Sequence, residues 1–393
     1  MLATRAAGNW PEFVGTGMVA GILTWVYVAS AGVPEAGTPG DVDFFRDSGD
    51  AILRGDLAAT YANPDMQGGP AQLVVDTVLL AWHGGSQAEW SVVRFVVLWA
   101  LLMTMVLLAR PRGSSPTQRL WAGGLVLALI ALRQASEFYR WGHWWHLPVV
   151  LAMAWAGGQA ASSRWVRAGV LLGLALWFEP FAAVGVAVLV LSPGLRVAIR
   201  AAVVAAVVAA LAYLPFVLTG SFAMGRRVLG VSPGTWASVV FGAQTPTSIS
   251  FTLRALEAVV AVTLAVLVMW HLRSRLPLPV VAFLAATAAV LARIAVEPFW
   301  WPYYPVVPFI LLACTAMRLA WLRRPETLPV GLGFLAMAIL SPFAPPLGAT
   351  VALLMIALAA LRVWTSLWDR FAVDFAPMRR GQEPDFVAES GTR

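Results

Sequence analysis

Long apolar stretches separated by short polar segments make up most of this sequence. A helix needs roughly 20 mostly apolar residues to cross a hydrocarbon layer of about 30 Å. The pattern predicts an all-α fold, a polytopic transmembrane helical bundle of about twelve segments. The predicted segments are 13–33, 90–109, 119–136, 146–161, 168–178, 180–191, 197–218, 255–272, 278–292, 303–320, 328–341 and 347–364.

Two apolar runs do not fit ordinary spans, because 168–191 is too long for one span and too short for two, and 71–82 is too short for one. The run 168–191 is interrupted by Glu179 and Pro180, which predicts two half-helices that meet in a turn beneath the outer surface. The run 71–82 predicts a juxtamembrane helix that closes the first external loop.

Composition agrees with this pattern and excludes a soluble protein. Hydrophobic residues make up 60% of the chain and charged residues only 12%, so there is too little polar surface to cover a soluble fold of this length. The net charge is +7, and all 27 basic residues are arginine, because the chain has no lysine. The single cysteine, Cys314, lies in an apolar run and gives neither a disulfide framework nor a cysteine-based metal site.

The arginines also predict an orientation. Most of them follow alternate spans, so they fall on one side of the bundle, and basic loops are typically cytoplasmic. We therefore expect a multi-pass protein of the plasma membrane with both termini in the cytoplasm. Residues 1–368 form one transmembrane domain, 34–89 its external first loop, and 369–393 a polar cytoplasmic tail.

The segment 40–55 carries an unusual acidic cluster on the external side. Asp41 precedes a helix-compatible run as a natural N-cap, and Gly55 ends that run. The predicted helix is amphipathic and lies on the membrane surface, with Asp47 and Asp50 on its solvated face. Asp43 is the carboxylate that these structural roles explain least.

Histidines, arginines and tryptophans concentrate in the other external loops. The stretch 137–146 contains Arg140, His143 and His146, and the tryptophans there are ordinarily an anchoring belt. The two histidines are spaced like a metal-binding pair, or they contact phosphate or sugar hydroxyls. No further metal ligand is evident from the sequence, so we expect no metal and no cofactor.

Four elements together resemble the membrane-embedded glycosyltransferases of the GT-C class, and most closely glycosyltransferase family 87, the polyprenol-phosphate-mannose-dependent mannosyltransferases of actinobacteria. Each element is a short, degenerate motif, and their order along the chain carries the resemblance. In order they are the Asp-bearing external loop and short helix from Asp41 to Gly55, the Tyr61 and Pro70 turn with the apolar run 71–82, the segment R-W-V-R-A-G-V-L-L-G-L-A-L-W-F-E-P, and the late external loop R-I-A-V-E-P-F-W-W-P-Y-Y.

The chain departs from that family's pattern at two places. It has Gln67-Gly68-Gly69-Pro70 where an aromatic-Pro-Pro turn is usual, and Glu179 where a basic residue is common. Alignment by the closing glycine places the family's catalytic aspartate on Asp41, whereas alignment by the D-x-D pattern places it on Asp43. The two alternatives stay open at this point.

The resemblance implies transfer of mannose or a related sugar from a polyprenyl-phosphate donor to an acceptor hydroxyl on a glycan or glycolipid of the cell envelope. One aspartate, Asp43 or Asp41, acts as general base with inversion at the sugar carbon. Arginines suit the departing phosphate because their planar fork matches its oxygens. The candidate residues for binding the substrate and its lipid phosphate are Arg293, Arg254, Arg140, His143, His146, Tyr303 and Glu297.

Two other classes of function fit the same sequence. Discontinuous helices around a buried Glu179 are typical of a transporter or lipid flippase. A non-catalytic relative of the enzymes is the third class. In every case the partner surface is a lipid bilayer, and no nucleic acid is expected.

Overall fold

A computed structural model describes residues 10–30, 41–81, 87–109, 140–242, 248–301, 303–322, 324–341 and 343–359. Within these residues the regular structure is helical, apart from one antiparallel pair of two-residue strands, β1 (Leu229–Gly230) and β2 (Ser248–Ile249). The prediction of an all-helical fold is confirmed at this level. The helices are α2 (Trp10–Ser30), α3 (Val42–Leu53), α4 (Leu57–Thr60), α5 (Pro70–Ala81), α6 (Gln87–Ala109), α9 (His146–Ala161), α10 (Trp165–Phe178), η2 (Pro180–Leu191), α11 (Leu195–Val217), η3 (Met224–Arg226), α12 (Trp236–Phe241), α13 (Phe251–Leu272), α14 (Leu278–Val296), α15 (Val306–Trp321), α16 (Thr327–Leu340) and α17 (Pro345–Leu358).

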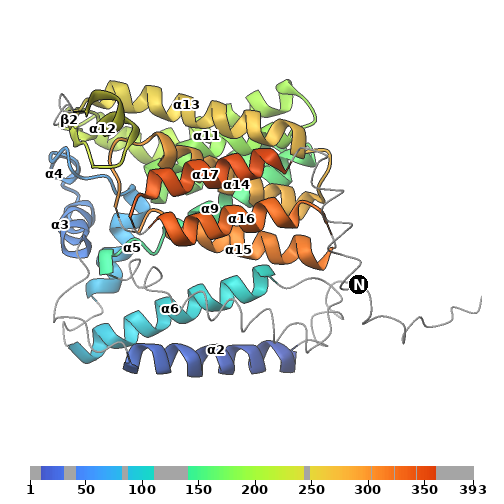
Figure 1. The fold of residues 1–393 in the computed structure, drawn as a ribbon. Helices are drawn as coiled ribbons and strands as arrows, with labels where there is room; N and C mark the ends of the chain where they lie inside the picture. Colours follow the sequence, from blue (N-terminus) through green and yellow to red (C-terminus); the bar gives the residue numbers. More distant parts are fainter. Residues whose placement is uncertain are drawn as a thin grey trace, which may run out of the picture.

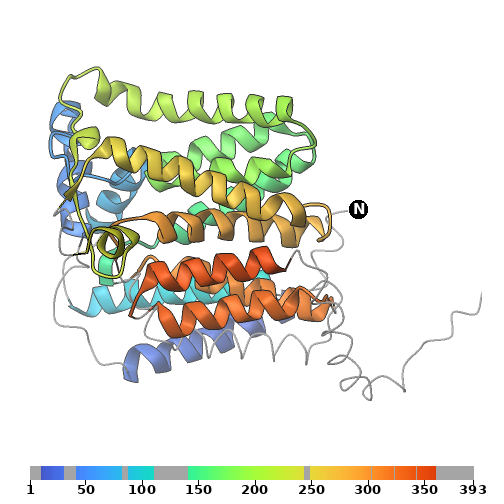
Figure 2. The same ribbon diagram turned by 45° about the horizontal axis from the view of Figure 1, so that its top comes forward.

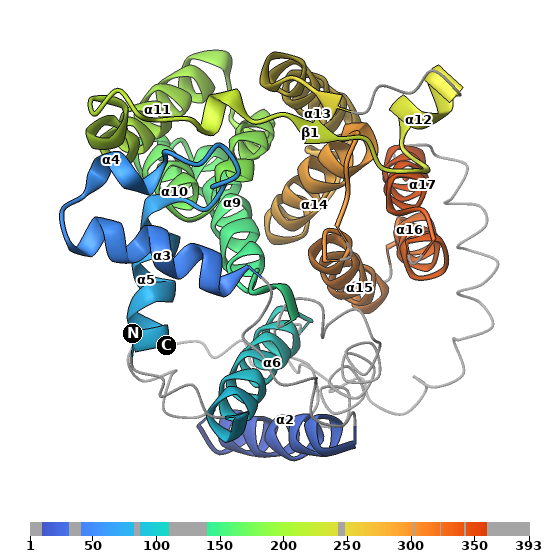
Figure 3. The same cartoon turned by 90° about the vertical axis from the view of Figure 1, so that its left-hand side faces the viewer.

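The long helices run side by side along roughly one direction (Figures 1 and 2). Helix α14 is the centre of the bundle, because it packs against α9, η2, α13, α15 and α17. Helices α2 and α6 pack together along one side (Figure 3). The main hydrophobic core lies among the central helices.

Three helical stretches of the described chain are long and apolar enough to cross a membrane: Leu195–Val217, Thr252–Leu272 and Leu278–Val296. The first of these, α11, turns large apolar side chains outward, with Leu195 74% and Leu211 64% exposed. An apolar helix face with no protein partner is typical of a lipid-facing surface. Eight shorter apolar helices accompany these three stretches.

Helices occupy the predicted segments throughout the described residues. The predicted segment 119–136 and the tail 369–393 lie outside them. The break at Glu179 is present, because α10 ends at Phe178, Glu179 has extended backbone (φ −140°, ψ 118°), and η2 begins at Pro180. The number of membrane crossings remains a prediction.

The alternation of helix directions gives the bundle two different ends. Helices α10 and α14 finish, and α9, α13 and α15 begin, at the end where α3 and α4 lie, on the left of Figure 1. The arginine-rich connections, around 164–167, 196–200, 273–275 and 318–324, follow at the opposite end. We call the first of these the α3 end.

Helix α3 differs in detail from the helix predicted there. Asp41 occupies its N-cap position, but the carboxylate makes no capping hydrogen bond and pairs instead with a histidine described below. The inward face is formed by Val42, Phe45, Gly49 and Ala51, whereas Leu53 is exposed. Helix α3 therefore packs on α5 by its first two turns, and Gly55 with φ +78° turns the chain after it.

Glycines allow two close contacts that position the turn at Glu179. Gly169 and Gly173 lie one turn apart on α10 and contact α11, where a Cβ would overlap Val204 and Val208. Gly69 lies against the backbone of α10 and donates its N–H to the Phe178 carbonyl at 2.9 Å. Gly69 thus brings the first loop directly onto the residue before Glu179.

Candidate active site at the α3 end

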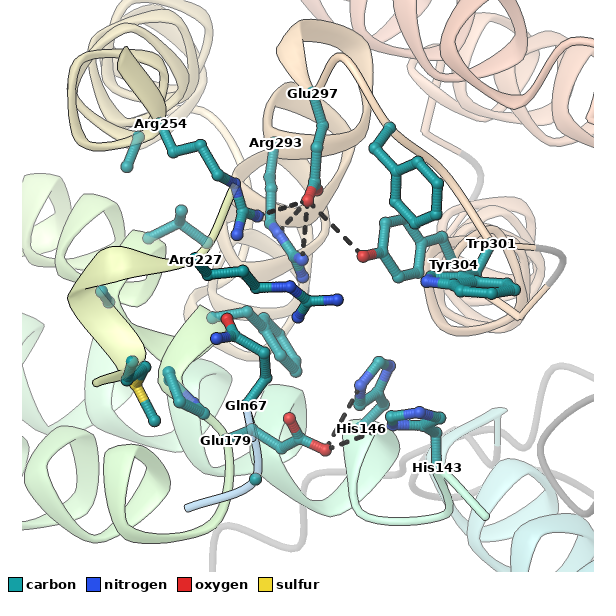
Figure 4. Close-up of a pocket in the computed structure, with 18 of the residues that line it drawn as sticks. Gln67, His143, His146, Glu179, Arg227, Arg254, Arg293, Glu297, Trp301 and Tyr304 are labelled. Carbon is teal, nitrogen blue, oxygen red and sulfur yellow. Dashed lines mark hydrogen bonds and ion pairs between the residues drawn. The ribbon is translucent and has the colours of Figure 1, made fainter. Parts of the chain in front are cut away.

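A cavity of about 650 Å³ opens at the α3 end of the bundle. Its walls come from the start of α3, the 143–146 turn, the break between α10 and η2, the start of α13, and the connection from α14 to α15. Much of the lining is apolar, including Phe45, Phe181 and Val184, and the charged side chains gather on two facing walls (Figure 4).

The first wall is a chain of carboxylates and imidazoles that we call the histidine wall: Asp41, His143, His146 and Glu179. The Nε2 atom of His143 lies 2.9 Å from Oδ2 of Asp41. On its other side, Nδ1 of His143 lies 3.7 Å from Oε1 of Glu179, and Nε2 of His146 lies 3.3 Å from the same oxygen. The start of α3, the 143–146 turn and the break after α10 therefore meet around His143.

Burial and charge act in opposite directions on His143. Burial favours the neutral imidazole, but the contacts with Asp41 and Glu179 favour the charged form and together raise the pKa of His143 above its ordinary value. The Asp41 carboxylate remains partly open to the cavity, with 37% of its side chain exposed. Asp41 can therefore accept a proton from a molecule in the cavity while His143 holds its other oxygen.

Residues behind the histidine wall hold it in place. With its amide nitrogen facing these acceptors, Gln72 donates to the Phe178 carbonyl at 2.7 Å and to Oε1 of Glu179 at 3.2 Å. The ring of His143 stacks on Tyr303, with centroids 4.1 Å apart and planes 18° apart. His146 meets Phe181 edge-on at 4.7 Å. These contacts fix the directions of both imidazole rings.

A buried carboxylate, Asp76 of α5, anchors the turn that carries the histidines. Its Oδ1 accepts hydrogen bonds from the indole N–H groups of Trp144 at 3.2 Å and Trp145 at 2.8 Å. Burial raises the pKa of Asp76 to about 7, although these two bonds oppose the shift. Two tryptophans of the predicted anchoring belt thus bond to a carboxylate in the protein interior.

The second wall carries the positive charge, and we call it the arginine wall: Arg227, Arg254, Arg293 and Glu297. Glu297 Oε1 lies 2.6 Å from Nη2 of Arg254, and Oε2 lies 3.0 Å from Nε of Arg293. Arg227 lies on the same side of the cavity and pairs with the exposed Asp65 at 3.4 Å. One buried carboxylate, Glu297, therefore orients two guanidinium groups at this wall.

Most of the residues expected from the sequence lie together around this cavity. Asp41, His143, His146, Arg254, Arg293, Glu297 and Tyr303 all line it.

Two expected site residues lie elsewhere. The side chain of Asp43, the first candidate for a general base, is 53% exposed, lies 3.5 Å from Arg46, and is not part of the lining. Arg140 is also exposed and outside the lining, with its guanidinium over the ring of Trp141. Helical geometry explains why Asp43 lies outside the cavity that Asp41 lines. Two positions along a helix rotate the direction of the side chain by about 200°.

Three contributors to the site were not among the favoured site residues. Glu179 stood out as a break in an apolar run, but its partners were not visible in the sequence. Gln72 looked like one polar residue in an apolar helix, and Arg227 was one of several external arginines. A polar residue within a short apolar run is the sequence signal that could have identified Gln72.

Comparisons with known proteins give no match to a protein-family model, a curated protein or a solved structure.

Proposed function

We propose that this protein is a membrane-embedded inverting glycosyltransferase that moves a sugar from a polyprenyl-phosphate donor to an acceptor hydroxyl. The observation that carries the proposal is the pairing of walls in one cavity. A partly open carboxylate held by a histidine and a cluster of arginines line the same space. Transfer from a sugar phosphate needs a base for the acceptor hydroxyl and cations for the leaving phosphate, and few other groups.

Asp41 is the general base in this proposal. Its carboxylate is in the cavity, and the hydrogen bond with His143 leaves one oxygen available to a substrate hydroxyl. Asp43 cannot take this role, because its side chain lies outside the lining of the cavity. Of the two alignments with family 87, the one that uses the closing glycine agrees with this choice.

The arginine wall binds the phosphate of the donor. Guanidinium groups on Arg254 and Arg293 are fixed by Glu297, so their remaining N–H groups are already oriented before a substrate enters. Arg227 adds a third cation from a different segment. Such prearranged donors stabilise negative charge that develops on a leaving group.

The reaction is a single displacement. The acceptor oxygen forms a bond to the anomeric carbon while the bond from that carbon to the phosphate oxygen breaks. The electron pair leaves with the phosphate, whose charge the arginines stabilise, and the hydroxyl proton passes to Asp41. Attack opposite the leaving group inverts the anomeric carbon.

The surroundings of the cavity suit a lipid-linked sugar. Phe45, Phe181 and Val184 offer apolar surface for a prenyl chain, and Trp301 offers an aromatic ring to a sugar. The arginine-rich connections lie at the opposite end of the bundle, which by the positive-inside rule supports a cavity on the external face of the plasma membrane. The acceptor would be a glycan or glycolipid of the cell envelope.

A matched pair of variants tests the proposal, because Asp41 and Asp43 are two residues apart and only one lines the cavity. In proteoliposomes supplied with a polyprenyl-phosphate sugar and membrane acceptors, Asp41→Asn should lower the transfer rate by roughly 100- to 10,000-fold. Asp43→Asn should retain most of the rate. Equal rates for wild type and Asp41→Asn would show that Asp41 is not the base.

A separate outcome would reject the enzymatic class altogether. If wild-type vesicles exchange the lipid-linked sugar between leaflets without forming a covalent product, the cavity belongs to a transport path.

A further inference from the structure

One atom in the histidine wall lacks a hydrogen-bond partner. Among the residues that the structure describes, Nδ1 of His143 is buried and makes no hydrogen bond, since Glu179 at 3.7 Å is too far away. His143 is only 8% exposed. A buried nitrogen without a partner has lost its hydration, so its position requires an explanation.

The spacing of the neighbouring atoms provides one. One ligand atom from each of His143, His146 and Glu179 lies within 4.8 Å of the others. Ligands about 2.0–2.1 Å from a tetrahedral Zn²⁺ are separated from each other by about 3.3–3.4 Å. The separations from Glu179 Oε1, 3.3 Å to His146 and 3.7 Å to His143, are close to that value.

The surrounding contacts are those that metal-binding histidines require. A histidine ligand typically donates its second ring N–H to a carboxylate, and Nε2 of His143 lies 2.9 Å from Asp41. When Nε2 donates that bond, the neutral imidazole keeps its Nδ1 lone pair for a metal ion, which replaces the proton of the charged form. Glu179 is in turn hydrogen-bonded by Gln72. In Figure 4 the three side chains point toward one another at the edge of the cavity.

We propose that His143 Nδ1, His146 Nε2 and the Glu179 carboxylate bind one divalent transition-metal ion, with Zn²⁺ as the best fit. Two imidazoles and one carboxylate are a donor set of catalytic zinc sites, which keep a fourth position open. Mg²⁺ and Ca²⁺ fit less well, because they prefer oxygen ligands throughout. The sequence provided only the pair of histidines, and the fold adds the third ligand.

The open position faces the cavity, opposite the arginine wall. If the proposed transfer reaction is correct, a donor phosphate or an acceptor hydroxyl would complete the coordination there. Coordination of a substrate by the ion rests on the proposed function, whereas metal binding itself does not.

Metal binding can be measured on the purified full-length protein in detergent. After a chelator has removed bound metal, wild-type protein equilibrated with Zn²⁺ should retain one ion per chain. Competition with a fluorescent chelator should give a micromolar or tighter dissociation constant. Co²⁺ in place of Zn²⁺ should give the visible absorption bands of tetrahedral coordination.

Variants locate the ion. Glu179→Gln and His146→Gln, which preserve side-chain size, should each weaken Zn²⁺ binding by about 100-fold or more, and Asp41→Asn by about 10- to 100-fold. His271→Gln is the matched control, because His271 is exposed in the last turn of α13 at the opposite end. Size-exclusion profiles and tryptophan fluorescence check that each variant is folded.

Two results would overturn the inference. One is wild-type protein that retains no stoichiometric Zn²⁺ in the micromolar range, and the other is equal binding by wild type, Glu179→Gln and His146→Gln. Sugar transfer by such metal-free protein would leave the proposed function standing. Conversely, Zn²⁺ binding without transfer would leave the metal site standing and reject the reaction.

Discussion

The Glu297→Gln substitution tests the arginine wall most directly. Glu297 is 4% exposed at its side chain and contacts two guanidinium groups, at 2.6 Å to Arg254 and 3.0 Å to Arg293. Glutamine keeps the size and one acceptor oxygen but removes the negative charge. The variant therefore leaves two half-buried cations without the carboxylate that contacts both of them.

The size of the effect follows from burial. Loss of one partner of a buried ion pair costs about 3–5 kcal/mol in unfolding free energy. The side chains of Arg254 and Arg293 are 20% and 17% exposed, so water screens part of the new repulsion. We expect destabilisation of about 3 kcal/mol, at the lower end of that range. Phosphate should reverse part of it, because an anion can replace the missing charge.

The assay is reversible unfolding in mixed micelles, followed by tryptophan fluorescence with and without inorganic phosphate. Glu326→Gln is the control, since Glu326 pairs at 3.3 Å with Arg324, whose side chain is 37% exposed. That variant should lose only about 1 kcal/mol, because partly exposed pairs contribute little. If Glu297→Gln is as stable as wild type and phosphate stabilises both equally, the arginine wall is not the electrostatic unit described.

Two further predictions concern the scaffold behind the cavity. Because burial raises the pKa of Asp76 from 3.8 to about 7, the folded state binds more protons than the unfolded state between these values, and stability should fall as pH rises from about 4 to 7. Asp76→Asn should remove this contribution, so a variant whose pH–stability curve parallels that of wild type would refute the assignment. Gly69→Ala should destabilise the fold by about 1–3 kcal/mol and lower transfer activity, because the new methyl group overlaps the backbone at Trp177 and Phe178. Gly158→Ala, where a Cβ meets nothing within 4 Å, should be neutral or stabilising in the same unfolding measurement.

Much of the helical layout follows from the sequence because membrane-type helices have a strong local signal. Apolar runs, the Glu179-Pro180 break and the arginine-bearing connections all correspond to structural features. The N-cap position of Asp41 was predicted correctly, but its side chain does not make the capping hydrogen bond. A short-range rule favours an N-cap bond, but the fold supplies His143 as a competing partner for the same carboxylate.

The sequence by itself determined which segments are helical, which end of the bundle collects the basic residues, and which polar side chains gather at the other end. These properties depend on composition and spacing over a few turns. Only the tertiary structure decided which carboxylate enters the cavity and which residues meet there. Asp41 and His143 are 102 positions apart, and Glu179 reaches both histidines from a third segment. Their contact depends on how the helices pack. Packing is set by the shapes of buried side chains and by buried polar atoms that need hydrogen-bond partners. No local sequence pattern encodes contacts between residues so far apart along the chain.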